Sequence, residues 1–158
     1  MASRRKARET LLKLLYLAES REISLDQAYR EMNAIDQEIT ITAGDEEKDE
    51  LKPFAGGLAE DQKEYVLSMG RKIEQNREDL HQTIRSLLKN WDFSRVSRID
   101  RLIMTIALAE MRYRPDIPPA VSMDEAIELA KEYSTEKSTA FINGILDTAR
   151  KKLEHPPV

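Results

Sequence analysis

The residues best suited to chemistry stand at the start of the chain, in the stretch "SRRKARETLLKLLY". Arg4, Arg5, Lys6 and Arg8 follow one another closely, and Tyr16 stands a few helical turns later. Arginine and lysine side chains bind phosphate groups, and an aromatic ring beside them can stack on an unpaired base. A helix beginning here would also offer the positive end of its backbone dipole to an anion. The pattern is typical of a surface that binds single-stranded nucleic acid.

Charge is distributed unevenly along the chain. The formal net charge of the 158 residues is −4, yet residues 1–13 hold five basic side chains against the single acid Glu9. That segment therefore carries +4 and the remainder of the chain −8. Such an asymmetry predicts one localised site for a polyanion on a body that repels polyanions elsewhere.

A helical wheel of the first segment places its charged residues close to its apolar ones. At about 100° per residue, Arg4 and Arg8 lie beside the apolar stripe that includes Leu11 and Leu14, whereas Tyr16 lies nearly opposite. Burying a guanidinium group is costly unless the group is paired. We therefore expect the first two helical turns to project past the body of the protein. A merely solvated helix end, and a packing role for Tyr16, are the alternatives.

Residues with catalytic or metal-binding potential are scarce. The chain has no cysteine, and its two histidines, His81 and His155, belong to no metal-binding spacing. There is no glycine-rich phosphate loop, and most serines stand where a helix is expected to begin, so that capping explains them. We expect a protein that is not an enzyme and uses no cofactor or metal, with His81 a polar surface or interface residue.

Helices must position these residues, because apolar side chains recur every three or four positions almost throughout and no strand pattern is convincing. Ser24 and Ser122 each begin a capping-box pattern, and Ser94 is a candidate cap for the most apolar stretch, which we expect to form the central helix of the second half. Trp91 falls at the end of the apolar stripe of the helix expected over residues 80–91. The predicted fold class is all-α, with about seven helices in two packed helical bundles. The expected helices cover residues 3–19, 24–35, 60–73, 80–91, 95–111, 122–133 and 135–153.

An acidic stretch without helical periodicity divides the chain. Residues 38–59 include "GDEEKDE", Pro53 and a Gly-Gly pair, a composition typical of a surface loop. We predict an N-terminal helical subdomain over residues 1–58, which holds the arginine-rich helix and the acidic loop, and a C-terminal helical bundle over 59–158. The loop is expected to be simply solvated, and shielding of the basic helix is the alternative.

The apolar runs also bear on the cellular compartment. No run approaches the roughly 20 residues that a membrane span requires, and no signal peptide is visible. The lack of cysteine suits a reducing compartment. We expect a cytoplasmic protein without membrane attachment.

Four motifs in order resemble the NusB family of bacterial transcription antitermination factors. The resemblance covers the first helix and most of the chain from residue 90 to the last helix. The motifs are "RRKARETLLKLLY" at 4–16, "NWDFSRVSRIDRLIMTIALAEM" at 90–111, "VSMDEAIELAKEYS" at 121–134 and "FINGILD" at 141–147.

The resemblance implies a fold of two packed helical bundles and a non-catalytic role in transcription. It implies that the protein forms a complex with a small-subunit ribosomal protein, the family's NusE, and that this complex binds boxA RNA. Bound there, the complex helps RNA polymerase to pass terminators in ribosomal RNA operons. A homodimer that hides the basic helix before the partner arrives is a further possibility.

The resemblance also assigns roles to individual residues. Asp100 falls in the region that the family uses against the ribosomal protein. Lys137 stands near the RNA face, at a place where a family branch carries an acid, so that RNA affinity or sequence preference can differ. The implied RNA contacts are Arg4, Arg5, Lys6, Arg8, Tyr16, Lys137 and Phe141.

Two alternatives from other classes stay open at this point. One is a protein scaffold whose basic helix meets an acidic partner instead of RNA. The other is the RNA-binding domain of a ribosomal-RNA methyltransferase, although the chain leaves no room for a catalytic domain. For "FINGILD", packing is the default reading: Phe141 would join an apolar stripe, and Gly144 would let another helix approach closely.

Overall fold

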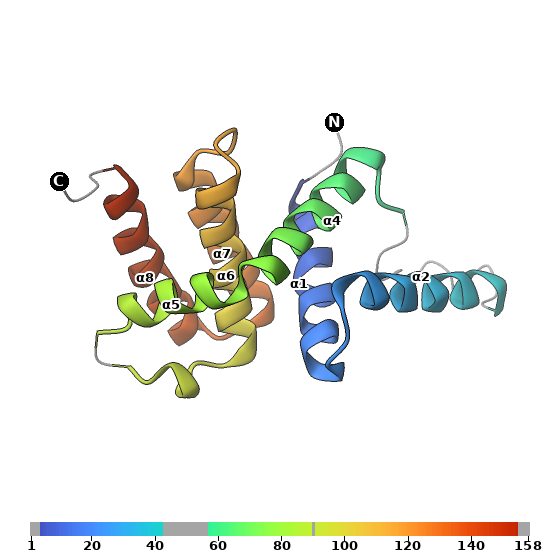
Figure 1. Ribbon diagram of the computed structural model, residues 1–158, viewed down its shortest axis with the longest axis horizontal. Helices are drawn as coiled ribbons and strands as arrows, with labels where there is room; N and C mark the ends of the chain where they lie inside the picture. Colours follow the sequence, from blue (N-terminus) through green and yellow to red (C-terminus); the bar gives the residue numbers. More distant parts are fainter. Residues whose placement is uncertain (1–3, 43–56, 90, 155–158) are drawn as a thin grey trace. The chain divides into compact units, whose positions relative to one another are not determined.

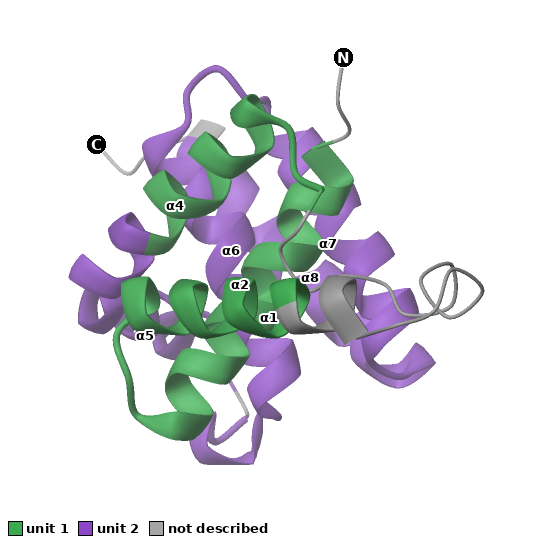
Figure 2. Cartoon of the chain, turned by 90° about the vertical axis from the view of Figure 1, so that its right-hand side faces the viewer, with its two compact units in different colours: residues 1–70 green, residues 71–158 purple. Residues whose placement is uncertain are grey.

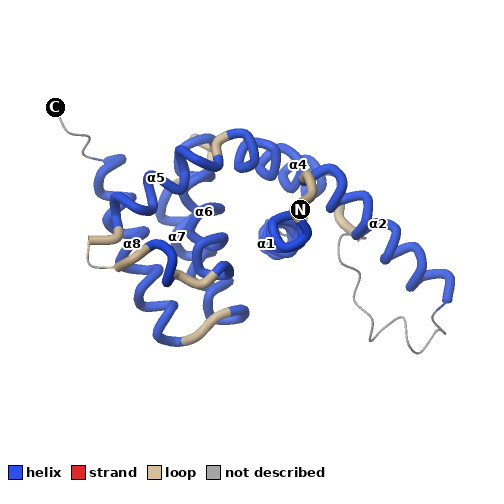
Figure 3. The backbone as a smooth tube through the Cα atoms, turned by 60° about the horizontal axis from the view of Figure 1, so that its bottom comes forward, coloured by secondary structure: helices blue, strands red, loops and turns tan. Residues whose placement is uncertain are grey.

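The computed structural model describes residues 4–42, 57–89 and 91–154, and within these ranges the predicted all-α fold is confirmed. Figure 3 shows helices and connecting loops there, and no strand. None of the described helices is both long enough and apolar enough to cross a bilayer. The described elements are α1 (Arg4–Arg21), α2 (Leu25–Thr42), α4 (Glu60–Gln75), α5 (Arg77–Leu87), the short 3-10 helix η1 (Phe93–Arg95), α6 (Arg98–Tyr113), α7 (Pro119–Tyr133) and α8 (Glu136–Glu154).

The acidic stretch predicted as a loop over residues 38–59 lies mostly outside the described residues. At its start, α2 continues to Thr42, through the short run "EITIT" that we expect to be no more than an extension of the second helix. A helix that has already formed extends at little cost per residue, even through a short run without a clear apolar pattern. At the other end of the stretch, α4 begins at Glu60, as expected.

The helices divide into two compact units, residues 1–70 and residues 71–158 (Figure 2). The first unit holds α1, α2 and most of α4, and the second holds α5 to α8. Our predicted subdomain boundary, after residue 58, lies inside the first of these units. Each unit has buried apolar residues of its own.

The core of the first unit forms around α1, which is buried over most of its circumference. Leu11 and Leu14 are fully enclosed, as the wheel predicts, and Leu12 is enclosed as well. Helix α2 packs against α1. The buried residues leave a strip of α1, about 160° wide on the helical wheel, for polar side chains. The other fully or almost fully buried apolar residues of this unit include Ala28, Met32, Tyr65, Val66 and Met69.

A tight turn joins α1 to α2. Glu22 adopts a left-handed φ of 54°, and the N–H of Ile23 donates to the carbonyl of Ala18 at 3.0 Å, which closes the end of α1. The hydroxyl of Ser24 then accepts a hydrogen bond from the backbone N–H of Gln27 at 3.2 Å. The predicted cap of the second helix is thereby confirmed.

The second unit is organised around α6, which packs against α5, α7 and α8 (Figure 1). Every residue from 100 to 111 is buried, so the most apolar stretch does form a central helix. Its predicted cap is wrong: Ser94 lies in η1, and the hydroxyl of Ser97 accepts instead from the N–H of Asp100 at 3.2 Å. Because the chain turns through η1 first, the helix starts later than periodicity alone suggested.

The predicted cap of the next helix is also wrong. Helix α7 begins at Pro119, with Pro118 before it, because a proline at the first helical position loses no hydrogen bond and already has a helical φ. Ser122 therefore lies inside the helix. It is buried there, and its hydroxyl donates to Oε1 of the fully buried Glu110 at 2.9 Å.

Two glycines have opposite surroundings. A Cβ at Gly70 would lie 2.4 Å from Cδ2 and 2.9 Å from Cδ1 of the buried Leu25, so that only a hydrogen fits between α4 and α2 at this point. A Cβ at Gly144 would meet no heavy atom of the described residues within 4 Å. The prediction that Gly144 admits a closely approaching helix is wrong.

Alanine at these two positions should change stability in opposite directions. We expect Gly70→Ala to lower the free energy of unfolding by about 1–3 kcal/mol, because the buried side chain of Leu25 must move. We expect Gly144→Ala to raise it by up to about 1 kcal/mol through helix propensity. Denaturant unfolding of both variants measures the two values. A Gly70→Ala variant as stable as Gly144→Ala would contradict the close approach.

Removal of the hydroxyl of Ser122 should also destabilise the second unit. In Ser122→Ala, the buried carboxyl group of Glu110 loses the hydrogen bond that this hydroxyl donates, at a cost of about 1–3 kcal/mol. The control is Ser86→Ala on α5, where the serine is exposed and its hydroxyl donates to the nearby Thr83 carbonyl at 2.7 Å. That variant should stay within about 0.5 kcal/mol of the parent protein. Denaturant midpoints compare the pair.

Candidate nucleic-acid interface

The first turns of α1 combine exposed and buried basic residues. Arg4, Arg5 and Lys6 are exposed, but Arg8 is only 4% exposed and the neighbouring Ala7 is fully buried. The prediction that the first two turns project past the body of the protein is therefore wrong. The helix packs along almost its whole length, and the side chain of Arg8 is therefore buried within the first unit.

The ring of Tyr65 is one of the contacts that the buried Arg8 makes inside the unit. This tyrosine, on α4, is fully buried, and the guanidinium carbons of Arg8 and Arg4 lie 5.9 Å and 5.4 Å from its ring centroid. The face of an aromatic ring attracts a cation, and this attraction is stronger where water is excluded. Arginine suits the position because its planar group is more weakly hydrated than an ammonium.

Lys6 connects the basic turn to the segment that precedes α4. Its Nζ donates a hydrogen bond to the carbonyl of Gly57 at 3.2 Å. Gly57 has a φ of 78°, in the left-handed region that glycine tolerates best. The Lys6 side chain is exposed, so its ammonium faces solvent beside this contact.

The exposed strip of α1 brings an arginine and an aromatic ring into line. Arg5 and Tyr16 lie within about 20° of each other on the helical wheel and about 16 Å apart along the axis, with the acid Glu9 close to the same line and Lys13 about 60° away from Tyr16. Tyr16 is 42% exposed, so the ring is not sealed in the core. The strip thus combines cations with an accessible aromatic face, the pairing that unpaired nucleotides require.

Three further predicted site residues meet in the second unit. Lys137 and Phe141 on α8 and Asp100 on α6 line a surface pocket of about 330 Å³. Phe141 contacts Trp91 there, with ring centroids 5.4 Å apart and planes tilted by 59°. The pocket is otherwise lined by Arg95, Val96, Ser97, Ser134, Thr135 and Ser138.

Asp100 is committed to contacts inside this unit. It is 6% exposed, and its Oδ1 accepts a hydrogen bond from the hydroxyl of Ser134 at 2.5 Å. The backbone N–H of Asp100 also donates to the hydroxyl of Ser97, which caps α6. The prediction that Asp100 faces a protein partner stays a prediction, and the structure adds a role for this carboxylate in joining α6 to the end of α7.

Sequence reasoning missed Trp91 and Arg95 as site residues. Trp91 was predicted on an apolar helical stripe, but α5 ends at Leu87 and the indole is 60% exposed in the connection that follows. A signal was present in "NWDFSR", where two aromatic residues flank an aspartate and an arginine follows. That aspartate, Asp92, accepts a hydrogen bond from the N–H of Ser94, and this bond lowers the pKa of the Asp92 carboxyl.

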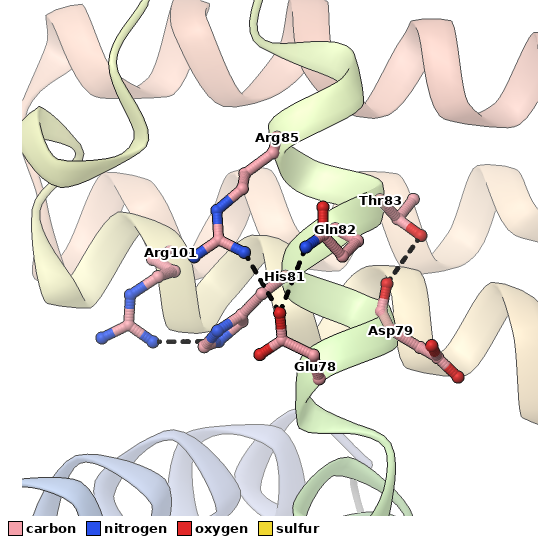
Figure 4. Close-up of polar contacts among 7 residues, drawn as sticks. All are labelled: Glu78, Asp79, His81, Gln82, Thr83, Arg85 and Arg101. Carbon is pink, nitrogen blue, oxygen red and sulfur yellow. Dashed lines mark hydrogen bonds and ion pairs between the residues drawn. The ribbon is translucent and has the colours of Figure 1, made fainter.

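His81 lies in a separate cluster of polar contacts on α5 (Figure 4). Its Nε2 lies 3.4 Å from a guanidinium nitrogen of Arg101. Arginine can only donate, so Nε2 accepts and the proton of a neutral imidazole belongs on Nδ1. Close by, Glu78 accepts hydrogen bonds from Gln82 and Arg85. The predicted polar role for His81 suits this setting, and no cluster of potential metal ligands occurs among the described residues.

Comparisons with known proteins identify the family. The NusB family model matches residues 5–151. The transcription antitermination protein NusB of Clostridium botulinum is 37% identical over 145 residues, which cover 91% of this chain and 96% of the relative. The crystal structure of NusB from T. maritima superposes with a TM-score of 0.75 at 32% identity, covering 99% of this chain and 94% of that one.

A further structural neighbour shows the fold alone. It comes from a crystal structure of a plectonemic RNA supercoil and has a TM-score of 0.76 at 22% identity, covering 99% of this chain and all of its own. The family model spans most of this chain, and the bacterial relatives cover nearly all of it. The chain therefore belongs to the NusB family of transcription antitermination proteins.

Proposed function

We propose that this protein is a non-catalytic, cytoplasmic adaptor that binds boxA-containing single-stranded RNA together with a small-subunit ribosomal protein, the NusE of its family. Through this complex it acts on the RNA polymerase elongation complex and promotes processive transcription of ribosomal RNA operons. The observation that carries the proposal is the exposed strip of α1, where Arg5 and Tyr16 lie within about 20° of each other on the helical wheel.

The strip matches the chemistry of an unpaired RNA strand. Arg4, Arg5 and Lys6 are exposed at a helix N-terminus, where the backbone dipole adds to their attraction for phosphate. Tyr16 offers a ring face on which a base can stack. The chain as a whole is acidic, so RNA is drawn to this strip rather than spread over the surface.

The contact of Arg8 with Tyr65 supports a different role for this arginine. Because Arg8 is almost fully buried, we assign it the positioning of α1 and leave direct phosphate contact to its three exposed neighbours. In the second unit, Lys137 and Phe141 are the proposed RNA contacts. The ribosomal protein is proposed to bind the region around Asp100, with the buried carboxylate maintaining the surface that the partner meets.

Removal of one exposed arginine should weaken RNA binding and its dependence on salt. For Arg5→Ala, the slope of log K against log salt should fall in magnitude by about 0.7, because one fewer phosphate contact releases counterions from a single strand. Fluorescence anisotropy with a boxA-like RNA oligonucleotide, over a series of salt concentrations, gives the slope.

Two arginine variants serve as controls for this measurement. Arg30→Ala makes the same charge change at an exposed position on α2 and should leave the slope unchanged. Arg8→Ala should mainly lower thermal stability and change the salt slope little, because it removes a buried cation from the ring of Tyr65. If Arg5→Ala kept the parent slope, the strip would not be the phosphate-binding surface.

Removal of the exposed tyrosine ring should cost affinity without a change of charge. We expect Tyr16→Ala to weaken RNA binding by about 1–3 kcal/mol, the usual value of one base stacked on an aromatic side chain. Tyr16→Phe keeps the ring and should retain most of this affinity. The same anisotropy assay measures both variants, and an affinity unchanged by Tyr16→Ala in a folded protein would return this residue to a packing role.

A comparison of RNA sequences separates this function from that of a protein scaffold. A boxA-like oligonucleotide should bind more tightly than a scrambled one of equal length, and the ribosomal protein should increase the difference. A scaffold that uses its basic helix for an acidic protein would treat both RNA sequences alike.

A further inference from the structure

Two arginines of α1 share one aromatic ring. Arg4 and Arg8 lie about one helical turn apart, and their guanidinium carbons lie 5.4 Å and 5.9 Å from the ring centroid of Tyr65 on α4. The tyrosine is fully buried and Arg8 almost so, whereas Arg4 is exposed. The ring therefore connects the interior of the first unit with a cation at its surface.

This arrangement offsets an electrostatic cost that the sequence of α1 creates. Like charges four residues apart on a helix repel each other, and cations in the first turn also face the positive end of the backbone dipole. The electron-rich face of an aromatic ring attracts guanidinium groups at the distances found for Arg4 and Arg8. The ring of Tyr65 thus favours one position for each arginine over the many rotamers of an unrestrained side chain.

An aromatic ring suits this task better than a carboxylate when the cation must also bind a ligand. A carboxylate would cancel the charge of a guanidinium group, but a ring carries no net charge and orients the cation without neutralising it. Contact with Tyr65 consequently orders the exposed side chain of Arg4 without reducing its attraction for an anion. Order that is established before binding lowers the entropy cost of the later contact.

We propose that Tyr65 is a positioning residue for RNA binding, whose buried ring holds the guanidinium group of Arg4 in place for a phosphate of the bound strand. Arg8 contacts the same ring and anchors α1 beside it. The inference rests on the proposed RNA-binding function and extends it to a residue of α4 that is enclosed in the core and acts only through another side chain.

Leucine and phenylalanine at position 65 separate the ring from the bulk of the side chain. Tyr65→Leu should weaken binding of a boxA-like RNA between about threefold and thirtyfold, because Arg4 must then be ordered on the ligand. Tyr65→Phe keeps the ring and should bind within about twofold of the parent. Fluorescence anisotropy with the ribosomal protein present gives the affinities, and circular dichroism shows which variants fold.

A second tyrosine provides the matched control. The ring of Tyr113 on α6 also contacts a cation, with Nζ of Lys72 at 5.5 Å from its centroid, but this pair lies in the second unit. Tyr113→Leu therefore removes a ring and a cation contact of the same kind away from α1. It should leave RNA affinity unchanged.

Double variants show whether Tyr65 acts through Arg4. Arg4→Ala should reduce the magnitude of the salt slope by about 0.7, whereas Tyr65→Leu keeps the charge and should leave the slope unchanged. In the Arg4→Ala background, Tyr65→Leu should weaken binding by less than about twofold, because the side chain that it positions is already absent. In the Arg5→Ala background it should retain its full effect. A purely structural role for Tyr65 would cause an equal loss in both backgrounds.

The parent protein offers a measurement that needs no substitution. Nuclear magnetic resonance relaxation of the arginine Nε–H groups should give Arg4 a higher order parameter in the free protein than Arg30, an exposed arginine of α2. Addition of RNA should then raise the value for Arg4 only slightly. An Arg4 side chain as mobile as Arg30 before RNA is added would overturn the positioning role, even where Tyr65→Leu does not fold.

The outcomes separate this inference from the proposed function. If Arg5→Ala weakens RNA binding but a folded Tyr65→Leu binds as tightly as the parent, the positioning role is wrong and the function stands. An equal loss in the Arg4→Ala and Arg5→Ala backgrounds overturns it in the same way. If the parent binds no RNA with or without the ribosomal protein, both proposals fail.

Discussion

Helix α1 must bury apolar side chains around most of its circumference while it carries a dense set of basic residues, and the rest of the first unit follows from this constraint. The one cation that cannot reach water, Arg8, lies against the ring face of Tyr65. Arg4, Arg5 and Lys6 in the first turn are exposed, and Lys13 is partly exposed. On the exposed side, Arg5 and Tyr16 lie within about 20° of each other on the helical wheel, so the packing that stabilises the unit also leaves its proposed binding surface open.

In the second unit, one buried and one partly buried hydrogen bond join α6 to α7. Near the start of α6, Asp100 accepts from Ser134 at the end of α7, and near the end of α6, Glu110 accepts from Ser122 close to the start of α7. The two contacts fix the antiparallel register of these helices at both ends. A buried carboxylate without a hydrogen-bond partner would destabilise the fold. With its partner in place, it favours one arrangement of the two helices over others. The first of these contacts also holds the segment that leads to Lys137 and Phe141.

Periodicity alone predicted the helices of this chain well, because an amphipathic helix repeats its apolar residues whatever it packs against. The buried run of α6 and the cap at Ser24 follow directly from residue types. Helix starts were harder: Ser94 and Ser122 looked like caps, but the 3-10 turn and Pro118–Pro119 decided the outcome. Local patterns cannot rank such competing signals when several lie within a few residues of one another.

The site was less accessible to sequence reasoning, because exposure depends on contacts between distant segments. The sequence of the first helix does not indicate that Arg8 contacts the ring of Tyr65. Likewise, an aromatic residue at the end of an apolar stripe gives the same pattern whether it is buried, as we expected of Trp91, or exposed. The structure therefore changed the expected roles of Arg8 and Trp91, because the exposure of both residues depends on tertiary packing. The residues that local chemistry assigned, Arg5 and Tyr16, are where the wheel placed them.

The hydrogen bond from Lys6 to Gly57 affects the entropy cost of binding an anion at this lysine. A free lysine side chain samples many rotamers, and fixing it on a ligand costs up to about 2 kcal/mol of entropy. An ammonium has three donors, so Lys6 can keep its contact with the carbonyl and still present two to an incoming oxygen. Part of that ordering is complete before any ligand arrives, which makes this lysine a preorganised contact rather than a tethered charge.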